Sequence, residues 1–371
     1  MAVTNFAALT DEQKTAWSMK FWRHMRNRSF LDRYTGSGED AIVQRVSELT
    51  RDEKGARAVL TLIADSKGDG VAADNQLEGN EEEIQSSDIV ITMDQLRHAH
   101  RHKGKMADQK SVVNFRGQAM NNLSYWMSDR LDQMALLTLS GISYSFATDG
   151  STRVGSQLPV LEFAADVSAP TANRNFRWDA TSGLLKNDAN SNLIAGDTLT
   201  WEALIDLKTQ AEYYKVKPIR GMDSGIAYYQ VFIHPLAMNS LKKDTDYLAN
   251  IRNAGVRGEA NALWKGTDSV MVDGMLLTPF HHTFTTMGAV SGSGKWGAGS
   301  DVDGSRILLC GAQALGMADI GRPTWVEKEF DYDNQPGISV GKIFGFRKPK
   351  FTDPTTDTVE DFGVMTLDVA I

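Results

Sequence analysis

Residues 106–139 read MADQKSVVNFRGQAMNNLSYWMSDRLDQMALLTL, a stretch that predicts one helix of unusual length. It has no proline and one interior glycine, Gly117, and its apolar residues recur mostly every three or four positions, on one helical face. Asp108 can cap the start, and Ser140-Gly141 can end the helix. The apolar residues on the predicted helical face are Val112, Phe115, Ala119, Leu123, Trp126, Leu131, Met134 and Leu137. At about 1.5 Å per residue the rod would be about 50 Å long, so we expect the rest of the chain to be arranged around it.

A coiled coil that pairs two chains is the alternative explanation for a helix of this length. The step of five residues from Trp126 to Leu131 and the absence of a sustained heptad repeat argue against it. We therefore expect a helix that packs within its own subunit.

Composition limits the classes of protein to consider. The chain has 371 residues, enough for two compact units, and its 42% hydrophobic content is normal for a folded protein. A net charge of −8 argues against a general nucleic-acid binder, whose surface is usually basic. The single cysteine, Cys310, lies in the apolar run RILLCGAQAL, which favours a buried core residue over a nucleophile. One cysteine also fits a chain made in a reducing compartment.

Neither a targeting signal nor a membrane span is expected. The first residues, MAVTNFAALTDEQ, lack a charged start followed by an apolar block, so they do not predict a secretory signal. No stretch approaches about 18 uninterrupted apolar residues, the length that a membrane-spanning helix requires.

The first segment predicts a basic helical arm over residues 12–34, capped by Thr10 or Asp11. An aromatic stripe and a set of basic residues share this helix. The arm could contact a polyanion or an acidic partner through its basic residues, or it could be a solvated helix docked by its aromatic residues, and the sequence leaves both open. After Gly36-Ser37-Gly38 a short helix is expected around residues 41–49. The stripe is Trp17, Phe21, Trp22 and Met25, and the basic residues are Lys14, Lys20, Arg23, Arg26, Arg28 and Arg33.

Residues 57–101 predict an extended hairpin. Two strand-like runs, ARAVLTLIAD and DIVITMDQLRHAH, flank a long glycine-rich middle. Such a middle cannot be buried in the core of a monomer, so we expect a neighbouring molecule to order it. Its carboxylates are Asp65, Asp69, Asp74, Glu78 and Glu81–Glu83.

The remainder mixes helices and strands without regular alternation. Residues 148–200 are polar, and helices are expected over residues 201–216 and 235–254. Short strand-like runs follow to the C-terminus, separated by glycine and proline. A parallel α/β sheet would require regular alternation, so the expected class is α+β.

Two sequence motifs resemble ligand-binding loops, but neither has all the residues that such a loop requires. The DSKGDG run at residues 65–70 begins like a calcium loop, but Lys67 holds a ligand position and Gln76 stands where a bidentate Glu is needed. Gly292, Gly294 and Gly297 fit a dinucleotide-binding loop in spacing, yet no helix is expected after them. A phosphate loop is also excluded, because Trp296 replaces the metal-binding Ser/Thr and the first glycine is out of register. We therefore read this segment as a surface loop.

The histidines do not predict a metal site either. His98, His100 and His102 alternate on one face of a strand and could hold zinc, but no fourth ligand is near in sequence and basic residues surround them. A basic patch at the base of the hairpin is the favoured interpretation. His281-His282 has no partner in sequence. The sequence offers no convincing active site, and we assign no catalytic, cofactor-binding or metal-binding residue.

The order of these parts resembles the major capsid proteins of tailed bacteriophages, and more narrowly the family typified by the coliphage N-four major capsid protein. The resemblance extends over nearly the whole chain and is least clear in residues 148–200. The motifs that carry it are GDGVAADNQLEGNEEE, DIVITMDQLRHA, GKMADQK, VFIHPLAMNSLKKD, VDGMLLTPF, RILLCGAQAL, WVEKEFDYDNQPGISVGKIFGFRKPKF and DFGVMTLDV.

The resemblance implies the Hong Kong 97-type capsid fold, with an N-terminal arm, an extended β-hairpin loop, a long spine helix, and peripheral and axial domains. It assigns residues 1–50 to the arm, 51–105 to the extended loop, 106–140 and 325–371 to the peripheral domain with the spine helix, and 141–324 to the axial domain. Hexamers and pentamers of such a chain close into an icosahedral shell around double-stranded DNA. The family implies no catalytic residues and no cofactor.

The resemblance also implies partners: other copies of the chain, a separate scaffolding protein during assembly, a portal protein and a decoration or cement protein. Packaged DNA would be contacted non-specifically, and we expect Arg23, Arg26, Arg28 and Arg33 to face it or the scaffold. The expected location is the virion, after assembly in the cytoplasm of the bacterial host. A shell protein of an encapsulin-like cellular nanocompartment is the closest alternative, and a metal-dependent hydrolase is a more distant one.

Overall fold

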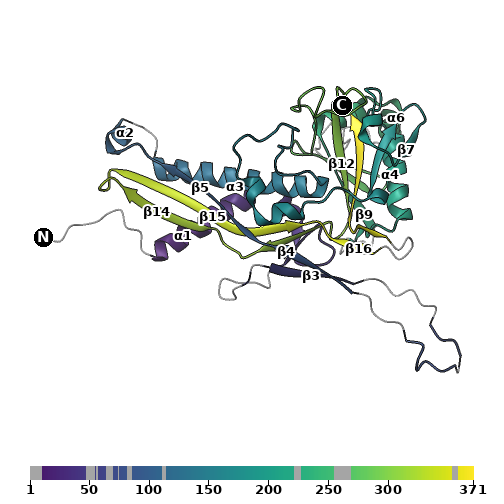
Figure 1. Ribbon diagram of the computed structural model, residues 1–371, viewed down its shortest axis with the longest axis horizontal. Coiled ribbons are helices and arrows are strands. Elements are labelled where there is room, and N and C mark those ends of the chain that lie inside the picture. The colour runs from purple at the N-terminus through teal and green to yellow at the C-terminus, as the bar shows by residue number, and fades with distance from the viewer. Residues whose placement is uncertain are drawn as a thin grey trace.

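The described part of the chain contains two large sheets connected by one long helix, and it has the expected α+β class (Figure 1). The structure is a computed structural model that describes residues 11–46, 55, 57–63, 70–73, 75–81, 86–110, 114–220, 227–254, 269–352 and 358–371. No helix within these ranges has the length and apolar character needed to cross a membrane.

The long helix is α3, Phe115–Ser140, with 26 residues and a length of about 39 Å. Its predicted end is confirmed: Gly141 adopts a left-handed φ of 69° and caps the last turn. Its predicted start is wrong, because the Asn114 side chain accepts a hydrogen bond from the Gly117 backbone N–H and caps a new helix there. Asp108 lies inside a separate short helix, α2, Lys105–Gln109, and Val112 lies outside the described residues.

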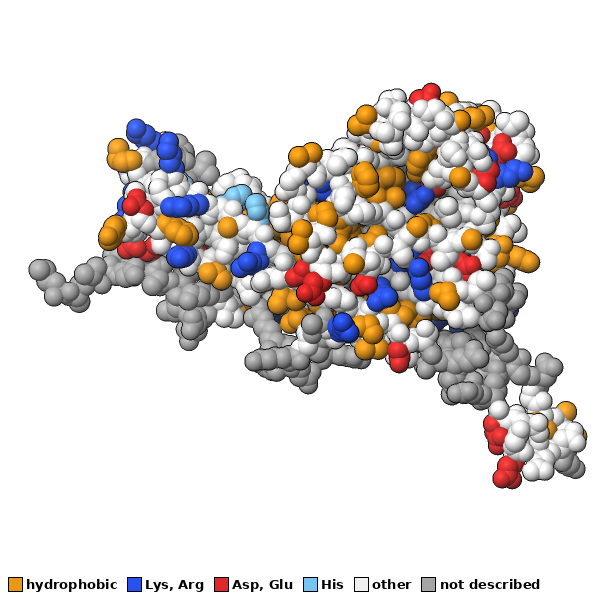
Figure 2. Space-filling view, viewed as in Figure 1, with side chains coloured by type: hydrophobic (Ala, Val, Ile, Leu, Met, Phe, Trp, Pro, Cys, Tyr) orange, Lys and Arg blue, Asp and Glu red, His pale blue; other side chains and the backbone are white. Residues whose placement is uncertain are grey.

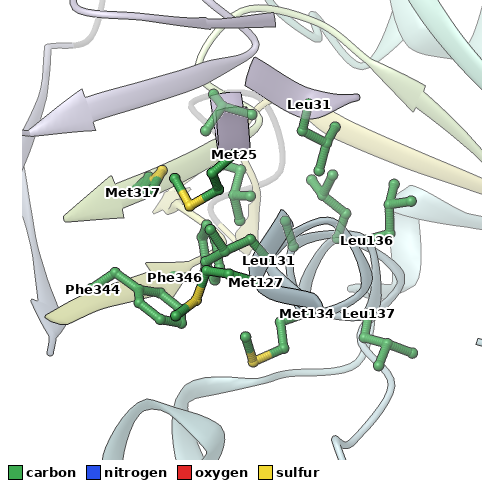
Figure 3. Close-up of a cluster of buried hydrophobic side chains, with 14 of the residues drawn as sticks. Met25, Leu31, Met127, Leu131, Met134, Leu136, Leu137, Met317, Phe344 and Phe346 are labelled. Atoms are coloured by element: carbon green, nitrogen blue, oxygen red, sulfur yellow. The ribbon is translucent and has the colours of Figure 1, made fainter. Parts of the chain in front are cut away.

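The two halves of α3 have different surroundings. The first half buries one face, with Ala119 and Leu123 inside, whereas every residue from Leu131 to Ser140 is buried. Figure 3 shows side chains from the arm, from β13 (Leu315–Asp319) and from β15 (Gln335–Arg347) against one part of the helix surface, while Met134 and Leu137 point away from them. The apolar face is therefore predicted correctly. In the second half of the helix, however, the residues outside this face are buried as well.

A six-stranded sheet lies along α3, and its central strand β15 has 13 residues. One part of β15 pairs with β14 and β5, and its C-terminal part pairs with β13, which in turn pairs with β2. Figure 1 shows the long β14–β15 ribbon extending away from the second sheet. The strands are β1 Thr35–Gly36, β2 Val43–Val46, β5 Asp94–Arg101, β13 Leu315–Asp319, β14 Thr324–Phe330 and β15 Gln335–Arg347.

The helix expected around residues 41–49 is wrong in its described part, because residues 43–46 form β2, parallel to β13. The backbone N–H of Leu315 donates to the carbonyl of Ile42 at 3.1 Å, and that of Gln313 to Ala41 at 2.8 Å. The edge of β13 thus provides hydrogen-bond partners for the backbone of this segment. Its β-branched residues favour a strand over a helix.

The predicted hairpin is confirmed in β3, Arg57–Ile63, and β4, Ser86–Thr92, which pair antiparallel. The run DIVITMDQLRHAH was expected to be one strand, but it forms β4 and β5, which are separated at Met93 and belong to different sheets. Met93 is buried in the core that joins the hairpin to β13, so the chain changes sheet at a residue that is itself part of the packing.

The eight-stranded sheet forms the second part of the molecule, in the order β10-β11-β9-β12-β18-β6-β7, with β8 pairing with β9. Every residue of β12 and of β18 is buried. Residues 325–371 are therefore divided, since β14 and β15 belong to the first sheet and β18 to the second. The strands are β6 Asn175–Asp179, β7 Leu184–Lys186, β8 Ile219–Arg220, β9 Ala227–Ile233, β10 Val270–Val272, β11 Met275–Pro279, β12 Gly304–Cys310 and β18 Val364–Ala370.

Helices and short elements complete the described fold. The remaining α-helices are α1 Asp11–Arg28, α4 Trp201–Tyr213, α5 Pro235–Lys243 and α6 Thr245–Ala254. The 3-10 helices are η1 Leu31–Tyr34, η2 Leu158–Val160, η3 Glu162–Asp166, η4 Ala172–Arg174 and η5 Asn190–Asn192. A two-stranded ribbon pairs β16 Lys350–Thr352 with β17 Val359–Asp361.

Candidate assembly surfaces

The arm helix α1 docks on its own subunit through its aromatic stripe. The Trp17 ring stacks on Trp325 of β14 with ring centroids 5.7 Å apart, and the buried Phe21 ring lies 6.1 Å from Trp325. Ser18 Oγ donates to the carbonyl of Pro323 at 2.6 Å. The interpretation of the arm as a helix docked by its aromatic residues is thus confirmed. The described basic residues of the helix lie on its other, solvent-exposed side.

One carboxylate on α3 anchors the turn that follows the arm helix. The Oδ1 atom of Asp132 accepts from Ser29 Oγ at 2.7 Å, and its Oδ2 atom accepts from the Phe30 backbone N–H at 2.8 Å. The Leu31 N–H also donates to Oδ1, at 3.3 Å. Burial raises the pKa of Asp132 above its ordinary value, although these three donors oppose the shift. The carboxylate therefore fixes the direction in which the arm leaves the spine helix.

The four arginines predicted to face DNA or the scaffold are all exposed, but two also bond within the subunit. Arg26 Nε lies 2.9 Å from Asp32 Oδ2. Arg28 Nη1 donates to the carbonyl of Asn121 on α3 at 2.7 Å and borders a shallow groove that Tyr125 also lines. Arg23 and Arg33 are exposed on the same segment. The sequence identified a cationic surface correctly, whereas the local bonds of Arg26 and Arg28 depend on the docking of the arm.

The hairpin has an anchored base. Its inner side chains form a core with Ala318 of β13, and the members on β3 are Ala58, Leu60 and Leu62. The Gly345 position on β15 is so close to the hairpin that an added Cβ would lie 2.0 Å from the Thr92 carbonyl oxygen. Only glycine permits this approach, so the base of the hairpin packs closely against the six-stranded sheet.

The described tip of the hairpin projects away from both sheets (Figure 1), and Figure 2 shows acidic side chains on it. Residues 75–81 are all exposed, and Leu77 retains 60% of its accessible surface. The hydrogen bonds found within this described segment are local, such as Asn75 Nδ2 to the Ala72 carbonyl at 2.8 Å. Glu78 and Glu81 belong to it, and the other predicted carboxylates, Asp65, Asp69, Asp74, Glu82 and Glu83, lie outside the described residues.

The three alternating histidines line the side of β5 that faces α3. The His98 ring stacks on Trp126 with centroids 4.5 Å apart, and the His102 ring meets Phe115 at 5.0 Å. Burial lowers the pKa of His98, and the neighbouring His100 and Arg130 lower it further. These rings therefore pack between strand β5 and the spine helix α3.

The other candidate motifs also have structural roles. The glycine-rich segment near residues 292–297 is a loop, as expected, and Lys295 pairs with Asp303 at 2.8 Å. Cys310 is buried in β12, as expected, and burial raises the pKa of its thiol. The calcium-like run lies almost entirely outside the described residues, since residues 64–69 are not among them.

One cluster of chemically capable side chains was missed. His281 and His282 have no partner in sequence, but the fold brings Asp129 of α3 to them. The Nε2 atom of His282 lies 2.7 Å from Asp129 Oδ1. The two residues are 153 positions apart, so the adjacent histidines were the only signal in the sequence, and it did not identify the acidic partner.

Comparison with known proteins gives one consistent result. Residues 5–371 match the family described as phage capsid protein. The major capsid protein of Pseudomonas phage KPP25 is 52% identical over 369 residues, which cover 99% of this chain and 97% of that protein.

Solved structures show the same fold. The capsid of Ralstonia phage GP4 covers 92% of this chain and 91% of its own, with a TM-score of 0.75 and 22% identity. The capsid asymmetric unit of cyanophage Pam1 covers 99% of each chain, with a TM-score of 0.70 and 19% identity. The similarity therefore concerns the entire fold rather than a single motif.

Proposed function

The chain belongs to the family of phage capsid proteins, and from this premise we propose how its surfaces build a shell. It is a major capsid protein with the Hong Kong 97-type fold, a structural and non-catalytic component of the virion that forms the icosahedral phage head. The 52% identity to a phage major capsid protein favours this function over the nanocompartment and hydrolase alternatives.

We propose that the subunits form hexamers and pentamers and that the chain falls in the narrower group typified by the coliphage N-four capsid protein. The observation that carries the assembly proposal is the hairpin, whose base packs against the six-stranded sheet while its described tip is exposed, acidic and locally bonded. A projecting two-stranded ribbon is marginally stable by itself, and a neighbouring subunit can supply the missing contacts.

The proposed domains are the expected ones, except that residues 325–371 are divided between the peripheral and the axial domain. Residues 1–50 form the arm and 51–105 the extended loop. The spine helix and the β14–β15 ribbon form the peripheral domain, and the eight-stranded sheet, including β18, forms the axial domain. The pairing of β18 with both β12 and β6 supports this assignment of the last strand.

Other partners are proposed on the resemblance alone. They are a separate scaffolding protein during assembly in the host cytoplasm, a portal protein, and a decoration or cement protein. Double-stranded DNA would fill the shell and be contacted without sequence specificity.

The experiment that tests the proposed function is assembly of the full-length chain, examined by negative-stain electron microscopy and sedimentation velocity. The expected result is closed, near-spherical particles alone or with co-expressed phage assembly proteins, because many small contacts that act together can hold a shell of many copies. A chain that stays monomeric under all of these conditions would contradict the proposal.

The cationic side of the arm gives a second test. Replacing Arg23, Arg26, Arg28 and Arg33 with glutamine removes four charges while retaining polar side chains of similar reach. We expect normal shells but a lower proportion of DNA-filled particles among those purified from infected cells, since each arginine lost removes attraction to a polyanion. Gradient centrifugation separates full from empty particles and measures the ratio.

The matched control removes charge from a different surface. Lys242 and Lys243 are exposed at the end of α5, and their replacement by glutamine should leave the ratio of full to empty particles unchanged. An effect of the lysine variant about half as large, for two charges removed instead of four, would indicate a dependence on net charge alone. An unchanged ratio in the arginine variant would refute the proposed contact.

A further inference from the structure

Asp129, His281 and His282 form a compact cluster where the spine helix meets the second sheet. Asp129 is on α3, and the two histidines are in the connection that follows β11. One carboxylate oxygen and one nitrogen of each ring all lie within 4.8 Å of one another. The two imidazole centroids are 3.9 Å apart. The cluster therefore brings together two ligand types that divalent transition metals prefer, imidazole and carboxylate.

Neighbouring residues orient two of the three ligands. The Nδ1 atom of His282 lies 3.5 Å from Thr148 Oγ1, which directs its Nε2 atom toward Asp129. Asp129 Oδ2 accepts from Gln133 Nε2 at 3.0 Å, which leaves Oδ1 on the side of the histidines. Supporting bonds of this kind fix the orientation of metal ligands in established sites.

Cationic groups also face the cluster and oppose a bound cation. Arg130 Nη1 lies 3.7 Å from Asp129 Oδ2, but it also donates to Gln133 Oε1 at 2.7 Å. Arg153 Nη2 donates to the same Gln133 oxygen at 2.6 Å. Asp149 and Asp129 act electrostatically on Arg153, and Asp132 interacts electrostatically with His282. Gln133 thus bonds both guanidinium groups and Asp129 Oδ2, whereas His282 lies at Asp129 Oδ1.

We propose that Asp129, His281 and His282 bind one divalent transition metal ion, with Zn²⁺ the best match to the ligands. His281 is exposed, so solvent can reach the ion and a water molecule can complete a tetrahedral shell. The ion would connect the spine helix to the loop between β11 and β12. This connection would stabilise the junction between the two sheets, independently of whether the subunit is assembled.

The test uses the full-length chain without a histidine tag, after removal of metals with a chelator. Titration with Zn²⁺ by calorimetry and with Co²⁺ by visible absorption is expected to give one equivalent per subunit. The melting temperature should rise with Zn²⁺, because a ligand that binds only the folded state stabilises it. His281→Ala is expected to weaken binding by at least about tenfold and to abolish the rise.

His281→Ala is the informative variant, because the residue is exposed and its loss should not prevent folding. The matched control is the double variant His98→Ala/His100→Ala, which removes two histidines from strand β5, beside another part of α3, and should bind Zn²⁺ like the wild type. Absence of stoichiometric binding to the wild type would overturn the proposal. So would binding that survives His281→Ala or is lost in the His98/His100 variant.

Discussion

Removal of the hairpin tip is expected to give a folded subunit that forms no closed shells. The change deletes residues 64–83 and replaces Ile84-Gln85 with Asn-Gly, a two-residue turn suited to joining β3 to β4. The base should remain intact, because its packing against β13 involves residues 58–62 and 89–93 and not the tip. Assembly should be lost, because the exposed and acidic tip has its contacts on another subunit in the proposed shell.

Two measurements separate folding from assembly. Circular dichroism and the melting temperature of the unassembled subunit should be close to those of the wild type. Electron microscopy and sedimentation should show no particles. Normal shells from the deletion variant would refute the role of the hairpin, and an unfolded variant would show that the base depends on the tip.

A charge variant identifies which property of the tip matters. Glu78→Gln/Glu81→Gln retains the length of the hairpin and removes two exposed carboxylates. If attraction to a basic neighbouring surface orders the tip, this variant should assemble less efficiently, and the defect should change with salt concentration. Assembly equal to that of the wild type would indicate that the backbone and Leu77 of the tip provide the contact instead.

Asp368→Asn is expected to lower the free energy of unfolding of the subunit by about 3–5 kcal/mol. Asp368 on β18 accepts two hydrogen bonds from the buried Arg306 guanidinium, at 2.8 and 2.7 Å. A third nitrogen of Arg306 donates to the Ser140 carbonyl at the end of α3, at 2.8 Å. The substitution would leave a buried cation without its counter-ion at the point where the spine helix joins the second sheet. Urea unfolding of the unassembled subunit measures the effect.

The controls distinguish a buried pair from ion pairs in general. The double variant Arg306→Met/Asp368→Leu should recover much of the lost stability, because no buried charge remains. Asp273→Asn affects an exposed pair, 3.2 Å from Lys208, and should cost less than about 1 kcal/mol. A loss below about 1 kcal/mol for Asp368→Asn would show that the guanidinium finds water or another partner, and the proposed role in the junction would then be wrong.

The sequence by itself determined the features that depend on neighbours along the chain. The end of α3 follows from Gly141, whose left-handed backbone conformation is accessible to glycine at little cost. The buried side of the arm follows from the aromatic stripe that includes Trp17 and Phe21, because residues three or four apart share a helical face. The family could be identified for a related reason, since the order of such local patterns is itself distinctive.

Only the tertiary structure decided the features in which distant segments compete for the same groups. The start of α3 moved to Phe115 because the Asn114 side chain caps the helix there, and residues 43–46 became a strand because β13 offered backbone partners. The Arg306–Asp368 pair and the cluster of Asp129 with His282 join residues 62 and 153 positions apart. No local pattern encodes such pairs, because their free energy exists only when the fold has removed both groups from water and placed them in contact.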